Sequence, residues 1–210
     1  MMNTSRTKLT RLPKRGAHDA ETIYPILDAA LVCHISYCID GQPFIIPTAF
    51  CRIEDTLYIH GSVGSHFFRE LAKGVHVCVA VTFIDGLILA RSAFSHSVNY
   101  RSVVAFGKSR LVEDEAESWL ALERITEQIM PGRWADTRHP NASEMKKTMV
   151  IAIPIEEASA KVRTGGVNDD PEDLALPYWA GVVPLSLTYH TPVPDEKRIK
   201  DVPLPDYLKG

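Results

Sequence analysis

The sequence predicts an α+β fold dominated by an antiparallel β-sheet. Short stretches rich in apolar and β-branched residues recur along the chain, and turn residues separate them. Two of the separators are the Asp-Gly pairs Asp40-Gly41 and Asp85-Gly86, which favour tight hairpins. Few segments carry a helical period. Six or seven strands of this kind close most easily into a small barrel with a few flanking helices.

The composition indicates a folded protein in water. The chain has 210 residues, of which 45% are hydrophobic, and this is enough for one good-sized domain. Its 23 basic and 26 acidic residues give a net charge of −3, which provides no basic field for nucleic acid. No apolar run approaches the roughly 18 residues of a membrane span. Four cysteines without C-x-x-C spacing, and no signal-peptide pattern, favour a reducing cytoplasm without metal or disulfide use.

We expect three parts along the chain. Residues 1–17 form a basic arm with no acidic residue, residues 18–190 form one barrel domain, and residues 191–210 form a proline-rich tail. The tail contains four prolines and is too rich in proline and charge to make a core by itself.

The first 60 residues predict one helix followed by three strands. Asp19 or Thr22 caps the helix, and Pro25 favours the later start because proline fits the first helical turn. Pro47 removes a hydrogen-bond donor from the second strand, which predicts a sheet edge, a bulge, or backbone that pairs with something other than a strand. The three strands are expected at residues 31–38, 43–53 and 57–60.

A run of small residues, Gly61 to Ser65, follows the third strand. It leads into a short helix at residues 66–73, which Gly74 closes. The loop leaves backbone N–H groups unpaired at the start of the helix, and this arrangement suits an anion.

The second half of the chain predicts further strands around one long helix. That helix covers residues 114–129, and residues 131–147 form a polar connection. Its apolar face is expected to contain Ala116, Trp119, Leu120, Leu122, Ile125 and Ile129. The strands are expected at residues 75–83, 100–112, 149–155 and 158–164, with an apolar strand-like run from Leu87.

Two apolar, strand-like runs flank a polar cluster that begins at Ser95. It consists of Ser95, His96, Ser97, Asn99, Tyr100, Arg101 and Ser102. A guanidinium binds phosphate through two hydrogen bonds, and hydroxyl groups add further donors, so the cluster predicts an anion site. Strand alternation, however, points Arg101 away from Tyr100 and Ser102, unless the strand bends or begins there. Arg101 has a second interpretation, in which it pairs with a nearby carboxylate.

Several blocks occur in the order typical of one family, over about residues 15–187. They are Cys33-His34-Ile35, Asp40-Gly41-Gln42-Pro43, Ile46-Pro47-Thr48-Ala49-Phe50, Leu57-Tyr58-Ile59-His60-Gly61-Ser62, Asp85-Gly86-Leu87, Ala90-Arg91-Ser92-Ala93-Phe94, Asn99-Tyr100-Arg101-Ser102-Val103 and Trp179-Ala180-Gly181-Val182-Val183-Pro184-Leu185. Together they resemble the pyridoxamine 5′-phosphate oxidase-like FMN-binding split barrels, in particular the branch of nitroimidazole-resistance and flavin-nucleotide-binding proteins.

The resemblance implies a six-stranded split barrel that forms a homodimer, with FMN at two sites along the interface. The backbone of residues 47–49 would lie along the flavin ring, and Trp179 would reach it from the partner subunit. The phosphate would be held by the Gly61–Ser65 loop together with the polar cluster. The residues implied in FMN binding are Pro47, Thr48, Ala49, His60, Gly61, Ser62, Ser65, Asn99, Tyr100, Arg101, Ser102 and Trp179.

The implied function is an FMN-dependent oxidoreductase of a small organic substrate, with a nicotinamide nucleotide as a candidate electron donor. Oxidation of vitamin B6 is not expected, because the helix region offers only His66 and Arg69 and residues 186–210 lack the substrate-binding Arg and His pattern. No catalytic residue or metal site stands out. Three alternatives remain open: flavin binding without turnover, haem binding through His60 or His96, and a dimeric interaction module without a cofactor.

Overall fold

The computed structural model describes residues 4–197 and 202–209, which form helices and mostly antiparallel strands. The strands are β1 (Gly16–Ala17), β2 (Val32–Ile39), β3 (Gln42–Ala49), β4 (Cys51–Ile53), β5 (Thr56–Ser62), β6 (His76–Leu89), β7 (Ser97–Lys108), β8 (Arg110–Leu111), β9 (Thr148–Pro154), β10 (Glu157–Arg163) and β11 (Gly181–Pro184). The α-helices are α1 (Ala20–Asp28), α2 (His66–Leu71), α3 (Glu115–Ile129) and α4 (Ala142–Lys146). Short 3₁₀ turns are η1 (Pro13–Arg15), η2 (Ala93–Ser95), η3 (Trp134–Asp136), η4 (Pro171–Asp173) and η5 (Asp206–Leu208).

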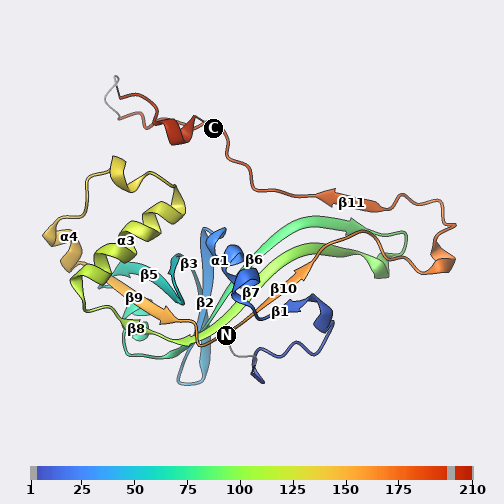
Figure 1. The fold of residues 1–210 in the computed structure, drawn as a ribbon, viewed down its shortest axis with the longest axis horizontal. Coiled ribbons are helices and arrows are strands. Elements are labelled where there is room, and N and C mark those ends of the chain that lie inside the picture. Colours follow the sequence, from blue (N-terminus) through green and yellow to red (C-terminus); the bar gives the residue numbers. More distant parts are fainter. Residues whose placement is uncertain (1–3, 198–201, 210) are drawn as a thin grey trace.

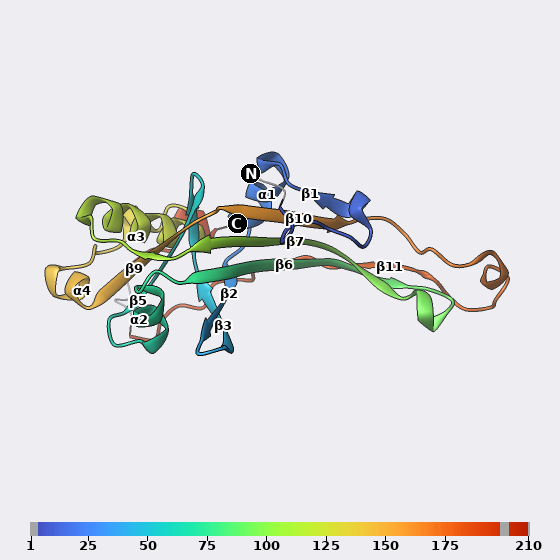
Figure 2. The same ribbon diagram turned by 90° about the horizontal axis from the view of Figure 1, so that it is seen from below.

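The strands form two antiparallel sheets (Figure 1). The larger sheet has the order β1-β10-β7-β6-β2-β3, with β11 also paired to β6, and the smaller has the order β4-β5-β9-β8. Strands β6, β7 and β10 run along the molecule, with α3 and α4 at one end and the β6–β7 tip at the other (Figure 2). The α+β class with a mainly antiparallel sheet is therefore confirmed. Among the described residues, the two sheets do not close into one hydrogen-bonded ring, so the fold differs from a simple closed barrel.

The two Asp-Gly pairs have different structures. Asp40 and Gly41 have φ values of 49° and 80°, the left-handed conformations of a type I′ turn, so this hairpin is confirmed. Asp85-Gly86 is not a turn, and the prediction there was wrong. Strand β6 continues through it to Leu89, with a bulge between Ile84 and Gly86. A side chain at Gly86 would approach the Val183 carbonyl to 3.2 Å, so glycine admits the neighbouring strand β11 instead of reversing the chain.

Helix α1 begins earlier than Pro25 suggested. Asp19 is its N-cap and accepts a hydrogen bond from the Thr22 backbone at 2.8 Å. The helix therefore contains Pro25. The packing of Ile23, Ile26 and Leu27 into the core offsets the cost of a proline inside the helix.

Apolar side chains form two cores. The larger is made by the big sheet, α1, α2 and the inner face of β5 and β9, and it contains Ile35, Phe50 and Ile59. The smaller lies between α3 and the other face of β5 and β9. Helix α3 buries Ala121, Leu122 and Ile125, whereas Ala116, Leu120 and Ile129 of its expected apolar face are exposed.

The polar connection after α3 contains the helical turns η3 and α4. Asn141 and Glu144 form a reciprocal capping box at the start of α4, a local signal that the sequence carried. Trp134 and His139 stack with ring centroids 4.5 Å apart and lie beside Trp119. This segment is therefore structured and covers one end of the small core.

The described part of the N-terminal arm lies on the large sheet. Arg6 pairs with Glu157, and β1 pairs with β10. Across residues 4–197 and 202–209, no helix is long and apolar enough to span a membrane.

Candidate functional site

Residues Pro47, Thr48 and Ala49 lie on β3, the edge strand of the large sheet. Pro47 is opposite His34 of β2, and the other edge of β3 has no partner strand in the described chain. Of the three alternatives that Pro47 left open, the structure shows the edge strand. The missing N–H of Pro47 costs no ladder bond if it lies on the free side.

The same strand exposes apolar side chains. Ile45 is 61% exposed, and Phe44 stacks on Tyr37 with ring centroids 5.3 Å apart. Tyr37 in turn contacts Phe67 of α2. An uncovered apolar edge backed by flat rings suits a planar ligand or a second protein chain.

The second predicted group lies where β5 ends. His60 is opposite Val150 of β9, and its side chain reaches solvent although the surrounding protein desolvates it enough to lower its pKa. The lowered pKa favours the neutral imidazole, which has one nitrogen lone pair. A side chain at Gly61 would lie 2.1 Å from the Phe68 ring, so this position requires glycine for packing.

The loop after Gly61 is a tight turn. The Ser62 hydroxyl accepts a hydrogen bond from the Gly64 backbone at 3.1 Å, and the Ser62 carbonyl accepts one from Ser65 at 2.9 Å. The Ser65 hydroxyl does not cap α2. Both hydroxyls therefore keep a proton that can be donated to a ligand.

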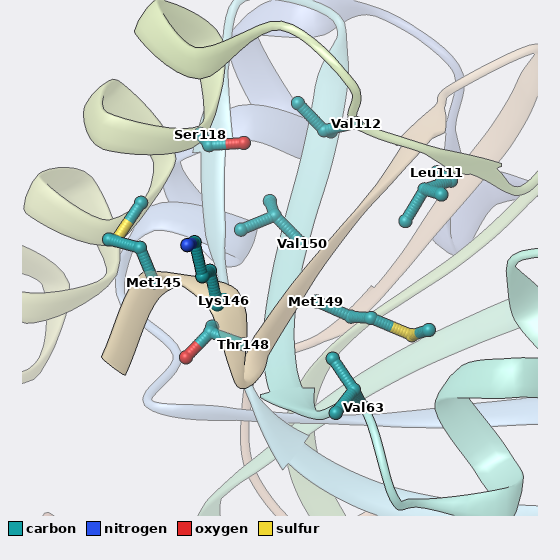
Figure 3. Close-up of a pocket in the computed structure, with 9 residues that line it drawn as sticks. All are labelled: Val63, Leu111, Val112, Ser118, Met145, Lys146, Thr148, Met149 and Val150. Atoms are coloured by element: carbon teal, nitrogen blue, oxygen red, sulfur yellow. The ribbon is translucent and has the colours of Figure 1, made fainter. Parts of the chain in front are cut away.

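A cavity of about 340 Å³ borders this loop (Figure 3). It lies among β9, α3 and α4, and a neighbouring hollow of about 400 Å³ shares Ser118, Met145 and Lys146 with it. Its lining is Val63, Leu111, Val112, Ser118, Met145, Lys146, Thr148, Met149 and Val150. None of these residues was predicted from the sequence, because they come from four separate segments. The cavity is mostly apolar with one ammonium and two hydroxyl groups.

Arg101 of the third group is paired within the chain. Its Nε and Nη2 atoms donate to the two carboxylate oxygens of Asp85, each at 2.9 Å. Its guanidinium also lies 4.6 Å from the Phe83 ring centroid. The hydrogen bonds that Arg101 donates to Asp85 raise the pKa of Arg101. The structure thus shows the carboxylate pairing that the sequence left open as a second interpretation.

The neighbours of Arg101 on β7 bind the next strand and its loop. Asn99 donates to the Gly165 carbonyl at 2.9 Å and accepts a hydrogen bond from Arg163 at 2.6 Å. The Ser102 hydroxyl donates to the Lys161 carbonyl at 3.4 Å. Tyr100 is opposite Ile84 and Arg163. Strand β7 is regular here, so Tyr100 and Ser102 share the face opposite to Arg101.

The loop group and the β7 group lie apart in one chain. Lys108, at the end of β7, lies beside Gly74 just after α2, and Arg101 is seven residues further along the strand. At about 3.3 Å per residue this is about 23 Å. Within one chain Arg101 therefore lies far from the end of α2.

Trp179 presents a free aromatic ring. It is 68% exposed, and it folds back over Gly181 at the start of β11. The loop that leads to it is anchored by Asp169, whose side chain is 1% exposed and accepts hydrogen bonds from the Arg91 backbone at 3.0 Å and Nη1 at 2.8 Å. The Arg91 Nε atom is buried and has no partner in the described chain. No local pattern predicted this pair, because 78 positions separate its members.

His96 lies at the tip of the β6–β7 hairpin. Its Nδ1 atom contacts the Ser92 carbonyl at 3.0 Å, and because a carbonyl only accepts, Nδ1 carries the proton. Nε2 is then the ring nitrogen left for another partner, as in histidines that ligate metals. Within the described ranges, no group of three or more His, Cys, Asp or Glu side chains is arranged to hold a metal ion.

The family assignment agrees with this arrangement. The sequence profile described as pyridoxamine 5′-phosphate oxidase matches residues 19–162, which is more than half of the chain. The chain belongs to the pyridoxamine 5′-phosphate oxidase family. No curated protein sequence matches it.

Solved structures of this family resemble the chain over most of its length. The flavocytochrome Anf3 from Azotobacter vinelandii has 38% identity and a TM-score of 0.90, covering 98% of this chain and 95% of its own. An FAD and haem binding protein from Mycobacterium smegmatis has 35% identity and a TM-score of 0.87, covering 92% and 95%. A Bacteroides thetaiotaomicron structure named for 5-nitroimidazole antibiotic resistance has 23% identity and a TM-score of 0.60, covering 70% and 86%, which shows a shared fold. The predicted family and its split-barrel fold are thus confirmed.

Proposed function

We propose that this protein binds a flavin and a haem and acts as an oxidoreductase on a small organic substrate. One observation carries the proposal: two structures that match more than 90% of the chain at 35% and 38% identity are named for both kinds of cofactor. Haem binding, which the sequence left open as an alternative, is therefore proposed together with flavin binding.

The flavin fits the exposed apolar edge of β3. Residues 47–49 offer backbone along an uncovered strand, and the Ser62 and Ser65 hydroxyls offer donors for a phosphate. Because the loop and β7 lie apart in one chain, the flavin site is proposed to form between two copies, with Trp179 of each copy against the ring of the other. The resemblance favours FMN, whereas the name of the Mycobacterium structure favours FAD.

The haem fits a histidine with a free ring nitrogen. Desolvation lowers the pKa of His60, which favours its neutral form, and the Nδ1 atom of His96 contacts a carbonyl, which leaves its Nε2 atom for another partner. His60 lies at the end of β5 and His96 at the hairpin tip, so substitution distinguishes the two.

The residues of the chain would bind and orient the cofactors. A bound flavin accepts electrons in pairs and releases them singly, and a bound haem carries one electron at a time. Exposed aromatic groups, including Trp179, would cover the ring and exclude water from it. The Arg101 guanidinium would lie near the phosphate. Before the phosphate binds, the Asp85 carboxylate would balance the charge of this guanidinium.

Cofactor release and substitution test the proposal. The mass of the flavin released by denaturation separates FMN from FAD. His60→Ala or His96→Ala is expected to abolish the Soret band of the haem-loaded protein, while His76→Ala, another exposed histidine, keeps it. An unchanged Soret band in both variants contradicts the assignment of the axial ligand.

Turnover is tested separately. Anaerobic addition of a nicotinamide nucleotide is expected to bleach the flavin, and a small organic acceptor is expected to restore its colour. A flavin that is never reduced and reoxidised would identify a flavin-binding protein without turnover. Pyridoxamine 5′-phosphate is expected to leave the colour unchanged.

A further inference from the structure

The cavity among β9, α3 and α4 has the size of a small-molecule site. Its volume of about 340 Å³ lies within the range of about 300–1,000 Å³ that is usual for ligand pockets. It adjoins the hollow of about 400 Å³ with which it shares Ser118, Met145 and Lys146. None of the residues proposed to bind the flavin or the haem lines it, although Val63 belongs to the Gly61–Ser65 loop.

The floor of the cavity is the small core. Val112 and Val150 belong to that core and are 7% and 4% exposed. Met145 of α4 and Met149 of β9 line the cavity beside them (Figure 3), and unbranched thioether side chains adapt to the shape of a ligand. The apolar part of a ligand would therefore be removed from water against these side chains.

Helix α4, which forms one wall, is fixed within the chain. Asn141 and Glu144 form the capping box at its start, and Glu144 also pairs with Arg138 at 2.8 Å. Just after the helix, the Lys147 carbonyl accepts a hydrogen bond from the Val63 N–H at 3.0 Å. Moving this wall to close the cavity would break these bonds, so the cavity is preformed.

Two polar groups of the lining have no partner in the described chain. They are the Lys146 ammonium and the Ser118 hydroxyl, which come from α4 and α3 (Figure 3). The Thr148 hydroxyl, by contrast, donates its proton to the Glu144 carbonyl at 2.9 Å. An ammonium only donates hydrogen bonds, and a serine hydroxyl has one proton to donate. The two free groups therefore fit a ligand group that accepts hydrogen bonds and is negatively charged.

The charges around the cavity favour an anion with a single charge. Glu117 and Glu144, on the same helices, each form an ion pair with an arginine. Glu115 lines only the neighbouring hollow and is exposed, so water and salt screen its charge. Because Lys146 is the one cationic residue of the lining, it balances one negative charge. A carboxylate thus fits better than a phosphate dianion.

We propose that this cavity binds a small carboxylic acid with an apolar body. The carboxylate would accept hydrogen bonds from Lys146 and Ser118, and the apolar body would lie against Val112 and Val150. An amine of the same shape would be repelled by the ammonium, and an alcohol would leave its charge unbalanced. The inference does not depend on the flavin or on the haem.

Calorimetric titration of the full chain with hexanoate tests the ligand class. Hexanoate is expected to bind at one site per chain. Hexanol and hexylamine carry the same apolar part, and they are expected to bind at least tenfold more weakly. The absence of saturable hexanoate binding, or hexanol or hexylamine binding as tight as that of hexanoate, overturns the proposal.

Substitution tests the residues. Lys146→Gln is expected to weaken hexanoate binding at least tenfold, and Ser118→Ala about threefold or more. Lys147→Gln is the matched control, because Lys147 is the next residue, is exposed and does not line the cavity, and it should leave the affinity within twofold. Glu115→Gln is expected to leave the affinity unchanged or raise it. Circular dichroism checks the fold of each variant. Equal affinities of Lys146→Gln and Lys147→Gln overturn the proposal.

Competition distinguishes this cavity from the cofactor site. An excess of flavin is expected to leave the affinity for hexanoate within twofold. Displacement of hexanoate by flavin would locate hexanoate in the cofactor site and overturns the proposal. A colourless protein that binds hexanoate contradicts the proposed function alone, and a coloured protein that does not bind it contradicts the cavity proposal alone.

Discussion

Arg101 and Asp85 form a bidentate ion pair between β7 and β6, with both N–O distances at 2.9 Å. Asp85 sits beside the β6 bulge, and its carbonyl also accepts the Leu185 N–H at the start of the C-terminal segment. One residue therefore joins the candidate phosphate ligand to the end of β11. The pair is about one-third exposed, so its own contribution to stability is at most about 1 kcal/mol.

Arg101→Ala tests whether this guanidinium binds the flavin phosphate. We expect flavin affinity to fall by about tenfold or more, because a charge-assisted hydrogen bond to an anion contributes about 1.5–3 kcal/mol. Fluorescence titration with flavin measures the affinity, and urea unfolding measures stability. Asp85→Asn is the matched control, since it keeps the guanidinium and removes its partner charge. Unchanged affinity in Arg101→Ala would show that the pair is only structural.

Gly61→Ala tests the packing at the end of β5. The added methyl group would lie 2.1 Å from the Phe68 ring, so the ring must move, and we expect a loss of about 1–3 kcal/mol of unfolding free energy. Gly166→Ala adds the same methyl group where no atom lies within 4 Å and should change stability little. Equal stabilities of the two variants in urea would be incompatible with this close packing.

Gln128→Ala tests the link between α3 and α1. The Gln128 amide donates to the carbonyls of Asp28 at 2.6 Å and Ala30 at 2.9 Å, which caps the end of α1. Its loss should cost about 1–2 kcal/mol. Gln42→Ala, which removes only a contact to the next residue, serves as control. A Gln128→Ala protein as stable as this control refutes the capping role.

Glu144 should couple the stability of α4 to pH. Hydrogen bonds from Arg138 and from the Asn141 backbone lower its pKa from 4.5 to about 2. A lowered folded-state pKa means that the stabilisation is complete above about pH 4.5 and is lost as the pH falls towards 2. Wild type is thus expected to exceed Glu144→Gln in melting temperature near pH 6, with the difference vanishing near pH 2. A difference that is constant over this range, or that also appears in the exposed control Glu113→Gln, contradicts the assignment.

Local signals in the sequence predicted the elements whose causes are local. Asp40-Gly41 gave the expected turn, and Pro47 marked an edge strand because a missing N–H has the same effect in any context. Asp85-Gly86 is the same dipeptide, but it lies in strand β6 where β6 pairs with β11. Strand β11 follows about a hundred positions later in the sequence. That contact is invisible in the local pattern, and so is the partner of Arg101.

The candidate site depended on distant pairings even more strongly. The Arg91–Asp169 pair and the cavity near Met145 and Met149 join segments that are far apart in the sequence, so neither was predicted. The family blocks indicated the split barrel because they carry order along the chain as well as composition. They could not show that the loop and β7 groups lie apart in one copy.

The absorption spectrum of the protein as purified tests the proposed function most directly. Flavin bands together with a Soret band are expected, and both should survive gel filtration. A colourless protein that takes up neither flavin nor haem on reconstitution would contradict the proposed function.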